Sequence, residues 1–281
     1  MIRQRVLSAL VLISIIIVGV WFGGPEGPAY PAFSLLVAVA AALGALEFYG
    51  ILGLSRRHPL TIFGLIWVLL FVLVAHFEGA YTAPLLTSAV VFSLVWLLLR
   101  SPVKGASINW VWTLAGIIYI GFMLSHFIPL RGLEVEGLEV GRDWVLFALF
   151  ATFAADSSAF FAGRLWGSHS LAPAISPGKT WEGAIGGFLG AIAAALILIA
   201  IFRTLSFPYW LSIPYWQGIV LGVLIGIFAQ LGDLSESMLK RSAAVKESGK
   251  LIPGHGGILD RLDSIVFTVV VVYYYVIWVI M

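Results

Sequence analysis

Residues 183–202 read GAIGGFLGAIAAALILIAIF, a run without a single charged side chain. A helix of about 20 residues rises about 30 Å, which matches the hydrocarbon thickness of a bilayer. The rest of the chain follows the same pattern, because 61% of its 281 residues are apolar, 11% are charged and its mean hydropathy is +1.04. Since a soluble domain carries about 25% charged residues, the composition excludes one and indicates a chain that folds in lipid.

Similar stretches recur along the chain, each close to the roughly 20 apolar residues that a transmembrane helix needs. The first follows Arg3 and Arg5 and could instead be a signal peptide, but its apolar core exceeds the usual length of about 7–15 residues and no A-x-A cleavage site follows. Only Glu78 separates the third stretch from the fourth, which favours a tight hairpin there. We therefore predict an all-α polytopic membrane protein of about nine transmembrane helices. The predicted helices are Val6–Phe22, Ala29–Leu54, Pro59–Phe77, Gly79–Leu99, Ile108–Leu130, Trp144–Gly163, Gly183–Phe202, Tyr215–Leu231 and Ser264–Met281.

The basic residues predict the orientation of these helices, because Lys and Arg are retained preferentially on the cytoplasmic side. With nine helices, one side of the membrane holds 13 of the 16 basic residues and the other holds only Arg131, Arg142 and Arg203. This split predicts a cytoplasmic N-terminus, with Met281 outside. We expect a multi-pass protein of the cell's inner, cytoplasmic membrane.

No linker is long enough to separate soluble domains, so we expect a single integrated membrane domain. Residues 1–150 are expected to form about five N-terminal helices and an external loop. Residues 151–281 are expected to form a catalytic transmembrane region with cytoplasmic loops at 164–182 and 232–263. In the external loop the sequence Gly-Leu-Glu-Val occurs twice, at 132–135 and 137–140. The two copies could pair as a small hairpin, but a solvated loop is the preferred interpretation.

The remaining composition limits the chemistry. Cysteine is absent, which excludes disulfides, thiolate catalysis and zinc sites of the Cys type. The net charge is only +2, and no run of like charges indicates a nucleic-acid partner. The position of each charge therefore matters more than the total.

Asp156 interrupts an apolar helix. An ionisable group at such depth costs about 3 kcal/mol unless it faces protein, water or a cation. It is therefore a candidate metal ligand, and pairing with Arg164 at the helix end is the structural alternative. Glu47 is a similar acid without a motif, and the sequence leaves its role open between function and structure.

The segment Ser176-Pro-Gly-Lys-Thr-Trp-Glu-Gly183 resembles a phosphate-binding loop at Gly178-Lys179-Thr180. A Walker loop also requires an earlier glycine, at the position that Pro173 occupies, so the spacing excludes that motif. Lys179 can still meet a phosphate as a point charge. Ser176 and Thr180 are candidate substrate-binding residues, although Thr180 and Glu182 could simply cap the next helix.

The densest chemistry lies at 232–263, GDLSESMLKRSAAVKESGKLIPGHGGILDRLD, with five basic and five acidic residues. Interleaved signs suit a site that holds a divalent cation together with several phosphates. If the eighth helix continues past Leu231, Asp233, Ser237 and Arg241 share one face, with Lys240 adjacent. We interpret the spacing of Glu236 and Lys240 as an ordinary surface pair.

Asp260 and Asp263 open the last helix and could lie beside Asp233 across a helix contact. They could also be plain helix caps, but two acids flanking Arg261 after a Gly-rich turn exceed what a cap requires. Carboxylates of this kind suit Mg²⁺, which usually takes one or two of them together with phosphate oxygens and water. The predicted metal ligands are Asp233, Asp260, Asp263 and Asp156.

His255 lies in the loop Pro253-Gly-His-Gly-Gly257. Glycines let backbone N–H groups approach an anion, so Gly256 and Gly257 are candidate substrate-binding positions. A functional role for His255 remains open between phosphate contact and proton transfer. The cations expected to contact phosphate are Lys179, Lys240, Arg241, Lys246 and Arg261.

These motifs together resemble a known signature. Ser237-Met-Leu-Lys-Arg, Lys246-Glu-Ser-Gly and Leu251-Ile-Pro-Gly-His-Gly-Gly-Ile-Leu-Asp-Arg-Leu-Asp263 are similar to the signature of phosphatidate cytidylyltransferases, the CDP-diacylglycerol synthases. Other blocks of that family resemble residues 176–183, Asp156-Ser with Gly163-Arg164, and Gly232-Asp-Leu. The chain departs from the pattern at Glu247, usually Asp, and at Gly178, commonly Lys.

The resemblance implies an Mg²⁺-dependent membrane enzyme in which phosphatidate of the inner leaflet attacks CTP, giving CDP-diacylglycerol and pyrophosphate. It also implies a homodimer. A CTP-dependent lipid-alcohol kinase is the rival enzyme, and it would release CDP without pyrophosphate. An ion-coupled transporter is the rival outside enzymes, but no inverted repeat is visible.

Overall fold

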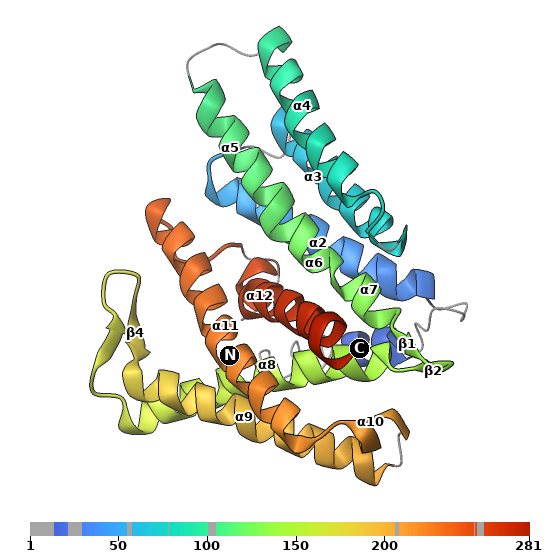
Figure 1. Ribbon diagram of the computed structural model, residues 1–281. Helices are drawn as coiled ribbons and strands as arrows, with labels where there is room; N and C mark the ends of the chain where they lie inside the picture. Colours follow the sequence, from blue (N-terminus) through green and yellow to red (C-terminus); the bar gives the residue numbers. More distant parts are fainter. Residues whose placement is uncertain are drawn as a thin grey trace. The chain divides into compact units, whose positions relative to one another are not determined.

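The computed structural model describes residues 14–21, 30–54, 58–77, 79–100, 105–205, 208–249, 251 and 256–281. In these ranges the chain is almost entirely helical, and eight helices are long and apolar enough to cross a membrane (Figure 1). This confirms an all-α polytopic membrane protein. Most of the predicted helix Val6–Phe22 lies outside the described residues. The eight spans are Pro31–Ile51, Pro59–Phe77, Thr82–Arg100, Ala106–Arg131, Gly141–Trp166, Trp181–Thr204, Tyr215–Ser242 and Leu259–Ile280.

The chain forms two compact units. The first comprises Met1–Pro129 together with Val245–Leu262, and the second comprises Leu130–Ala244 together with Asp263–Met281. The loop before the last helix therefore belongs to the unit built by the N-terminal helices, although it lies far from them in sequence.

The first unit is built from α2 (Tyr30–Ile51), α3 (Pro59–Val74), α4 (Thr82–Arg100) and α5 (Ala106–Gly116), with short helical segments at η1 (Ala75–Phe77) and α6 (Met123–Ser125). The segment η2 (Ile117–Phe122), which continues α5, is a π-helix.

His58 caps α3, because its Nδ1 accepts a hydrogen bond from the N–H of Leu60 at 3.3 Å, and Pro59 needs no such partner. Tyr49 fixes α2 against α5, since its hydroxyl donates to the carbonyl of Thr113 at 3.0 Å.

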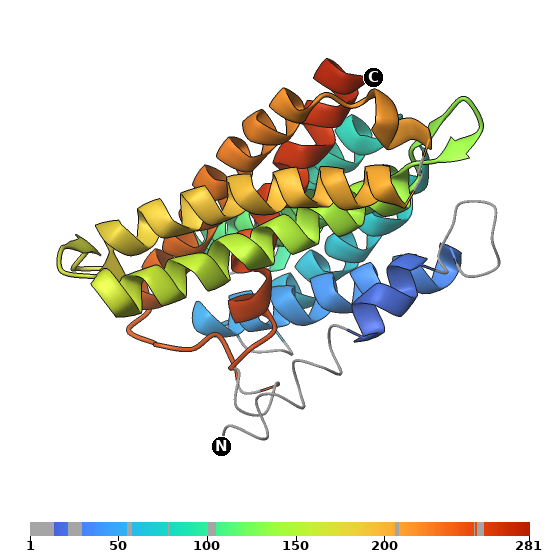
Figure 2. The same ribbon diagram turned by 90° about the horizontal axis from the view of Figure 1, so that it is seen from below.

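The second unit is built around α8 (Gly141–Trp166), α9 (Trp181–Thr204) and α11 (Tyr215–Ser242), with α10 (Pro208–Ser212) and the last helix, α12 (Leu259–Tyr275) continued by the π-helical η3 (Val276–Ile280). The helices α8 and α9 run side by side (Figure 2). The glycines of α9 pack closely against α8, because a Cβ at Gly183 would lie 2.9 Å from the carbonyl oxygen of Ala159 and one at Gly187 3.0 Å from that of Ala155.

Two short hairpins join these helices. After α7 (Phe127–Arg131), β1 (Glu134–Val135) pairs with β2 (Leu138–Glu139), in the register Glu134 to Glu139 and Val135 to Leu138. The prediction of a solvated loop here was wrong, and the alternative of a hairpin was right. Glu136 and Gly137 both adopt positive φ, 52° and 78°, which is the turn whose twist matches that of two paired strands.

The second hairpin replaces most of the loop expected at 164–182. The helix α8 continues to Trp166, β3 (Ser170–Ala172) pairs with β4 (Ser176–Thr180), and α9 begins directly afterwards at Trp181. The loop expected at 232–263 is also shorter, because α11 continues to Ser242 and α12 begins at Leu259. Both predicted loops were too wide, since polar residues extend these helices beyond their apolar spans.

Candidate functional site

Charged side chains of the second unit gather where α8, β4, α11 and α12 come together. The best-defined contact joins the Nζ of Lys179, on β4, to Oδ2 of Asp233, on α11, at 2.8 Å. Both side chains keep partial access to solvent, at 24% and 35% of their surface. The Asp233 side of the pair is the more accessible, because the Nζ atom of Lys179 is itself buried.

The predicted helical face of Asp233, Ser237 and Arg241 is confirmed, because α11 continues through all three. The Ser237 hydroxyl lies 3.4 Å from Oδ1 of Asp233, one turn earlier. One turn later, Nε of Arg241 donates to the carbonyl of Ile175 at 3.1 Å. Arg241 thus ties α11 to the turn that leads into β4, the strand that carries Lys179.

The pair Glu236–Lys240 differs from its prediction as a surface pair. The Lys240 Nζ lies 2.5 Å from Oε2 of Glu236, as the spacing predicts, but Glu236 is fully buried and Lys240 is only 9% exposed. Removing one partner from a buried pair leaves an uncompensated charge, which costs about 3–5 kcal/mol. The two side chains therefore hold each other in place, and the surface interpretation was wrong.

Asp263, on α12, lies beside Asp233, as predicted. Its charged neighbours are Asp233, Glu236 and Asp156. The carboxylate of Asp156 accepts a hydrogen bond from the hydroxyl of Ser264 at 3.2 Å, which links α8 to α12. Acids of three helices are thus gathered at one place in this unit.

The chemistry of these donors fits Mg²⁺. Among the residues that the structure describes, no group of three His, Cys, Asp or Glu side chains is assembled as a metal cage. Magnesium commonly takes only one or two protein carboxylates and completes its shell with substrate phosphates and water. Asp233, Asp263 and Asp156 supply carboxylate oxygens of this kind.

The segment before α9 is organised by its own side chains. The hydroxyl of Thr180 accepts a hydrogen bond from the N–H of Gly183 at 3.1 Å, so the capping alternative is confirmed for this residue. Glu182 accepts from Nδ1 of His169 at 2.6 Å and from the N–H of Ser168 at 3.1 Å. Ser176 pairs with Ala172 in the hairpin. Lys179 is held between these anchors, with its ammonium group directed to Asp233.

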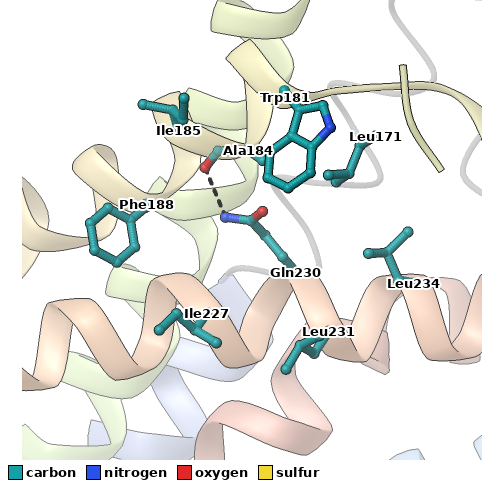
Figure 3. Close-up of a pocket in the computed structure, with 9 residues that line it drawn as sticks. All are labelled: Leu171, Trp181, Ala184, Ile185, Phe188, Ile227, Gln230, Leu231 and Leu234. Carbon is teal, nitrogen blue, oxygen red and sulfur yellow. Dashed lines mark hydrogen bonds between the residues drawn. The ribbon is translucent and has the colours of Figure 1, made fainter. Parts of the chain in front are cut away.

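An apolar groove runs between α9 and α11 in the same unit (Figure 3). It measures about 290 Å³, and the amide of its one polar residue, Gln230, donates to the carbonyls of Ala184 and Gly226, both at 2.9 Å. Of its lining residues, Leu234 directly follows Asp233 in sequence, and Trp181 lies two residues after Lys179. Its lining residues are Leu171, Trp181, Ala184, Ile185, Phe188, Ile227, Gln230, Leu231 and Leu234.

The remaining predicted residues lie in the first unit. Asp260 accepts hydrogen bonds at Oδ2 from the N–H groups of Gly257, at 2.8 Å, and Ser248, at 3.1 Å. The N–H of Gly257 therefore binds this carboxylate in the structure, and Gly256 takes φ of +83°, which favours glycine. Lys246 and Arg261 are exposed. His255 lies outside the described residues, and the pairing of Asp260 with Asp233 stays a prediction.

Two further residues, neither with a role predicted from the sequence, organise this loop region. Glu47, on α2, accepts hydrogen bonds at Oε2 from the hydroxyl of Ser248 and from the N–H of Leu259, both at 2.9 Å. For Glu47, the only indication in the sequence of a role was its position as an acid within an apolar helix. For Ser248, the sequence offered no indication beyond its place in the segment Lys246-Glu-Ser-Gly.

The fold and the charged cluster define a polytopic membrane protein with a polar site at the ends of its helices. The chain belongs to the Cytidylyltransferase family, whose pattern matches residues 3–279. It is similar to the phosphatidate cytidylyltransferases of Bacillus subtilis, with 34% identity over 96% of this chain and 94% of the relative, and of Haemophilus influenzae, with 35% identity over 94% and 95%. The phosphatidate cytidylyltransferase of Synechocystis sp. is 33% identical over 98% of this chain and 96% of its own length.

Proposed function

We propose that this protein transfers the cytidylyl group of CTP to phosphatidate, giving CDP-diacylglycerol and pyrophosphate. The observation that carries the proposal is the match to phosphatidate cytidylyltransferases over nearly the whole length of both chains. An oxygen of the phosphatidate phosphate forms a bond to the α-phosphorus of CTP, and the bond from that phosphorus to the β-phosphate oxygen breaks. Phosphate monoesters have a second pKa near 6, so the nucleophile is largely ionised at neutral pH without a protein base.

The residues of the second unit suit this reaction. Transfer between phosphates asks a protein chiefly for positioning and for neutralisation of charge. Lys179 is fixed to α11 by its ion pair with Asp233, and Lys240 is fixed by Glu236. Arg241, on α11, is fixed by its hydrogen bond to the carbonyl of Ile175. We assign the phosphates to these three cations.

We propose that Mg²⁺ is held by one or two carboxylates of the set Asp233, Asp263 and Asp156, together with substrate phosphates. When bound, the ion neutralises phosphate charge and polarises the phosphorus that is attacked. The support is the gathering of these carboxylates from three helices beside the ion pair of Asp233 and Lys179. By resemblance to the family, Asp260, Lys246 and Arg261 of the first unit belong to the same reaction.

We place one acyl chain of phosphatidate in the groove between α9 and α11. Two observations support this location. The groove is lined by apolar side chains, and Trp181 and Leu234 of its lining adjoin Thr180 and Asp233 in sequence. A lipid bound there has its chain against apolar residues and its phosphate near the ammonium group of Lys179.

We further propose that the site faces the cytoplasm in the inner membrane and that the protein acts as a homodimer. The orientation rests on the split of 13 basic residues against 3, which fits a cytoplasmic position for the charged loops. The dimer rests on the resemblance to the family alone. Light scattering of the purified protein, corrected for detergent, measures the mass of the protein part, and 30.5 kDa would contradict the dimer.

The test of the function uses the purified full chain in lipid nanodiscs with CTP, phosphatidate and Mg²⁺. We expect equal amounts of pyrophosphate and CDP-diacylglycerol, and loss of both products in Asp233→Asn. Release of CDP without pyrophosphate would instead identify a lipid kinase. Absence of any lipid product from a folded protein would refute both enzyme functions.

A further inference from the structure

The carboxylate of Glu47 is the centre of a hydrogen-bond network in the first unit. A single oxygen, Oε2, accepts from the Ser248 hydroxyl and from the N–H of Leu259, both at 2.9 Å. Ser248 lies within the loop between α11 and α12, and Leu259 is the first residue of α12. Glu47 therefore ties this loop and the start of α12 to the membrane helix α2.

The network continues from Ser248 to Asp260. The Ser248 N–H donates to Oδ2 of Asp260 at 3.1 Å, and the Ser248 hydroxyl lies 3.3 Å from the N–H of Asp260. The N–H of Gly257 closes the network by donating to the same Oδ2 at 2.8 Å. The position of the Asp260 carboxylate is thus set by groups that Glu47 holds.

Two glycines show how closely the loop is packed on Glu47. A Cβ at Gly249 would come closer than 3.0 Å to Oε1 of Glu47, and one at Gly257 would come that close to Oε2 and to the Ser248 hydroxyl. Both positions accept no side chain unless the carboxylate moves. The backbone at Gly249 and at Gly257 therefore packs directly against the Glu47 carboxylate.

We propose that Glu47 is a positioning residue of the cytidylyl-transfer reaction, which fixes residues 245–249 and 256–262 so that Asp260, Lys246 and Arg261 keep the positions that the reaction requires. The inference rests on the proposed function and adds to it a residue of the N-terminal half of the chain. Glu47 acts through Ser248 and Asp260 and does not contact substrate. An acid on an apolar membrane helix is costly, and these contacts account for its presence.

The substitutions Glu47→Ala and Glu47→Gln separate positioning from charge. Both hydrogen bonds converge on one oxygen, and the amide carbonyl of Gln can accept both, so Glu47→Gln should restore most of the turnover that Glu47→Ala loses. A misplacement of about 1 Å costs about 100-fold in rate. We therefore expect kcat to fall at least about tenfold in Glu47→Ala while KM for CTP changes little.

Cleavage by trypsin after Lys246 measures the loop without reference to activity. We expect faster cleavage in Glu47→Ala than in wild type, and cleavage near the wild-type rate in Glu47→Gln. Glu134→Ala, in the hairpin of the second unit, is the matched control and should change neither cleavage nor turnover. If Glu47→Ala does not fold, Ser248→Ala removes one of the two bonds and should show the same changes in smaller measure.

Each outcome of these experiments either supports or overturns the positioning role of Glu47. If Glu47→Gln is as inactive as Glu47→Ala, the charge itself is required and the positioning role is wrong. If Glu47→Ala keeps wild-type kcat and wild-type resistance to trypsin, Glu47 has no role in the loop. A wild-type protein that makes no CDP-diacylglycerol refutes the proposed function, whereas the trypsin result still tests the anchoring of the loop.

Discussion

Gly232 offers the sharpest test of the geometry around Asp233, because α12 approaches α11 closely at this glycine. A Cβ at this position would come closer than 3.0 Å to the carbonyl oxygen of Asp263, whereas ordinary contacts lie at 3.4–4 Å. The substitution Gly232→Ala must therefore move α12 by more than 0.4 Å, the difference between 3.4 and 3.0 Å. The displaced atom belongs to the residue whose carboxylate lies beside Asp233.

The expected loss of turnover follows from that displacement. A misplacement of about 1 Å lowers the rate about 100-fold. A shift of roughly half that size should therefore lower kcat at least about tenfold, which corresponds to an activation barrier raised by about 1.4 kcal/mol. The free energy of unfolding should fall by less than the full overpacking cost of about 1–3 kcal/mol. Ala offsets part of that cost, because its helix propensity is about 1 kcal/mol more favourable than that of Gly. The measurement is kcat with CTP and phosphatidate, alongside thermal unfolding.

Gly218→Ala is the matched control on the same helix. Its Cβ would lie 2.5 Å from Cδ1 of Ile199, the end of a flexible side chain that can rotate away. This variant should keep wild-type turnover. The reasoning is refuted if Gly232→Ala keeps wild-type kcat, or if Gly218→Ala loses as much activity with its fold intact.

Four further predictions concern orientation, phosphate, metal and lipid. A reporter at Met281 should lie outside the cytoplasm and one inserted at 243–249 inside; two reporters on one side would contradict nine helices. Arg261→Lys should lose activity with stability unchanged, because Lys lacks the planar fork of Arg, and full activity would exclude bidentate phosphate binding. Asp233→Asn should remove most turnover, and titration with Mg²⁺ should not restore it; recovery to the wild-type rate would make its role structural. Ala184→Trp should narrow the groove and raise KM for long-chain more than short-chain phosphatidate, whereas equal effects would place the acyl chain elsewhere.

Hydropathy predicted the spans well because a lipid-facing backbone must satisfy its own hydrogen bonds, which leaves the helix as the form that an apolar stretch of this length adopts. The ends of the helices were less predictable. The helix α11 continues 11 residues beyond Leu231, to Ser242, because its polar turns are stabilised by contacts such as that of Arg241 with Ile175. The hairpin at 134–139 depends on a left-handed Glu136, which few sequence patterns indicate.

Within the candidate site, spacing along one helix was informative. Asp233, Ser237 and Arg241 are related by whole turns, and their shared face follows from helical geometry alone. Burial of Glu236 depends on which helices surround it, and one sequence carries no record of that. The partners of Glu47 lie 201 and 212 residues away, so no local pattern could connect them.

The long separation between Glu47 and its partners has a consequence for how the protein is made. A ribosome adds about 5–20 residues per second, so about 10 s or more pass between synthesis of Glu47 and synthesis of Ser248, 201 residues later. Throughout that interval the acid of α2 is in the membrane without the hydroxyl and amide that will bind it. The loop that completes the first unit is translated after α3 to α11, and a chain interrupted before α12 lacks Leu259, the second donor to Glu47. Assembly of the first unit therefore waits for a segment made about 200 residues after α2.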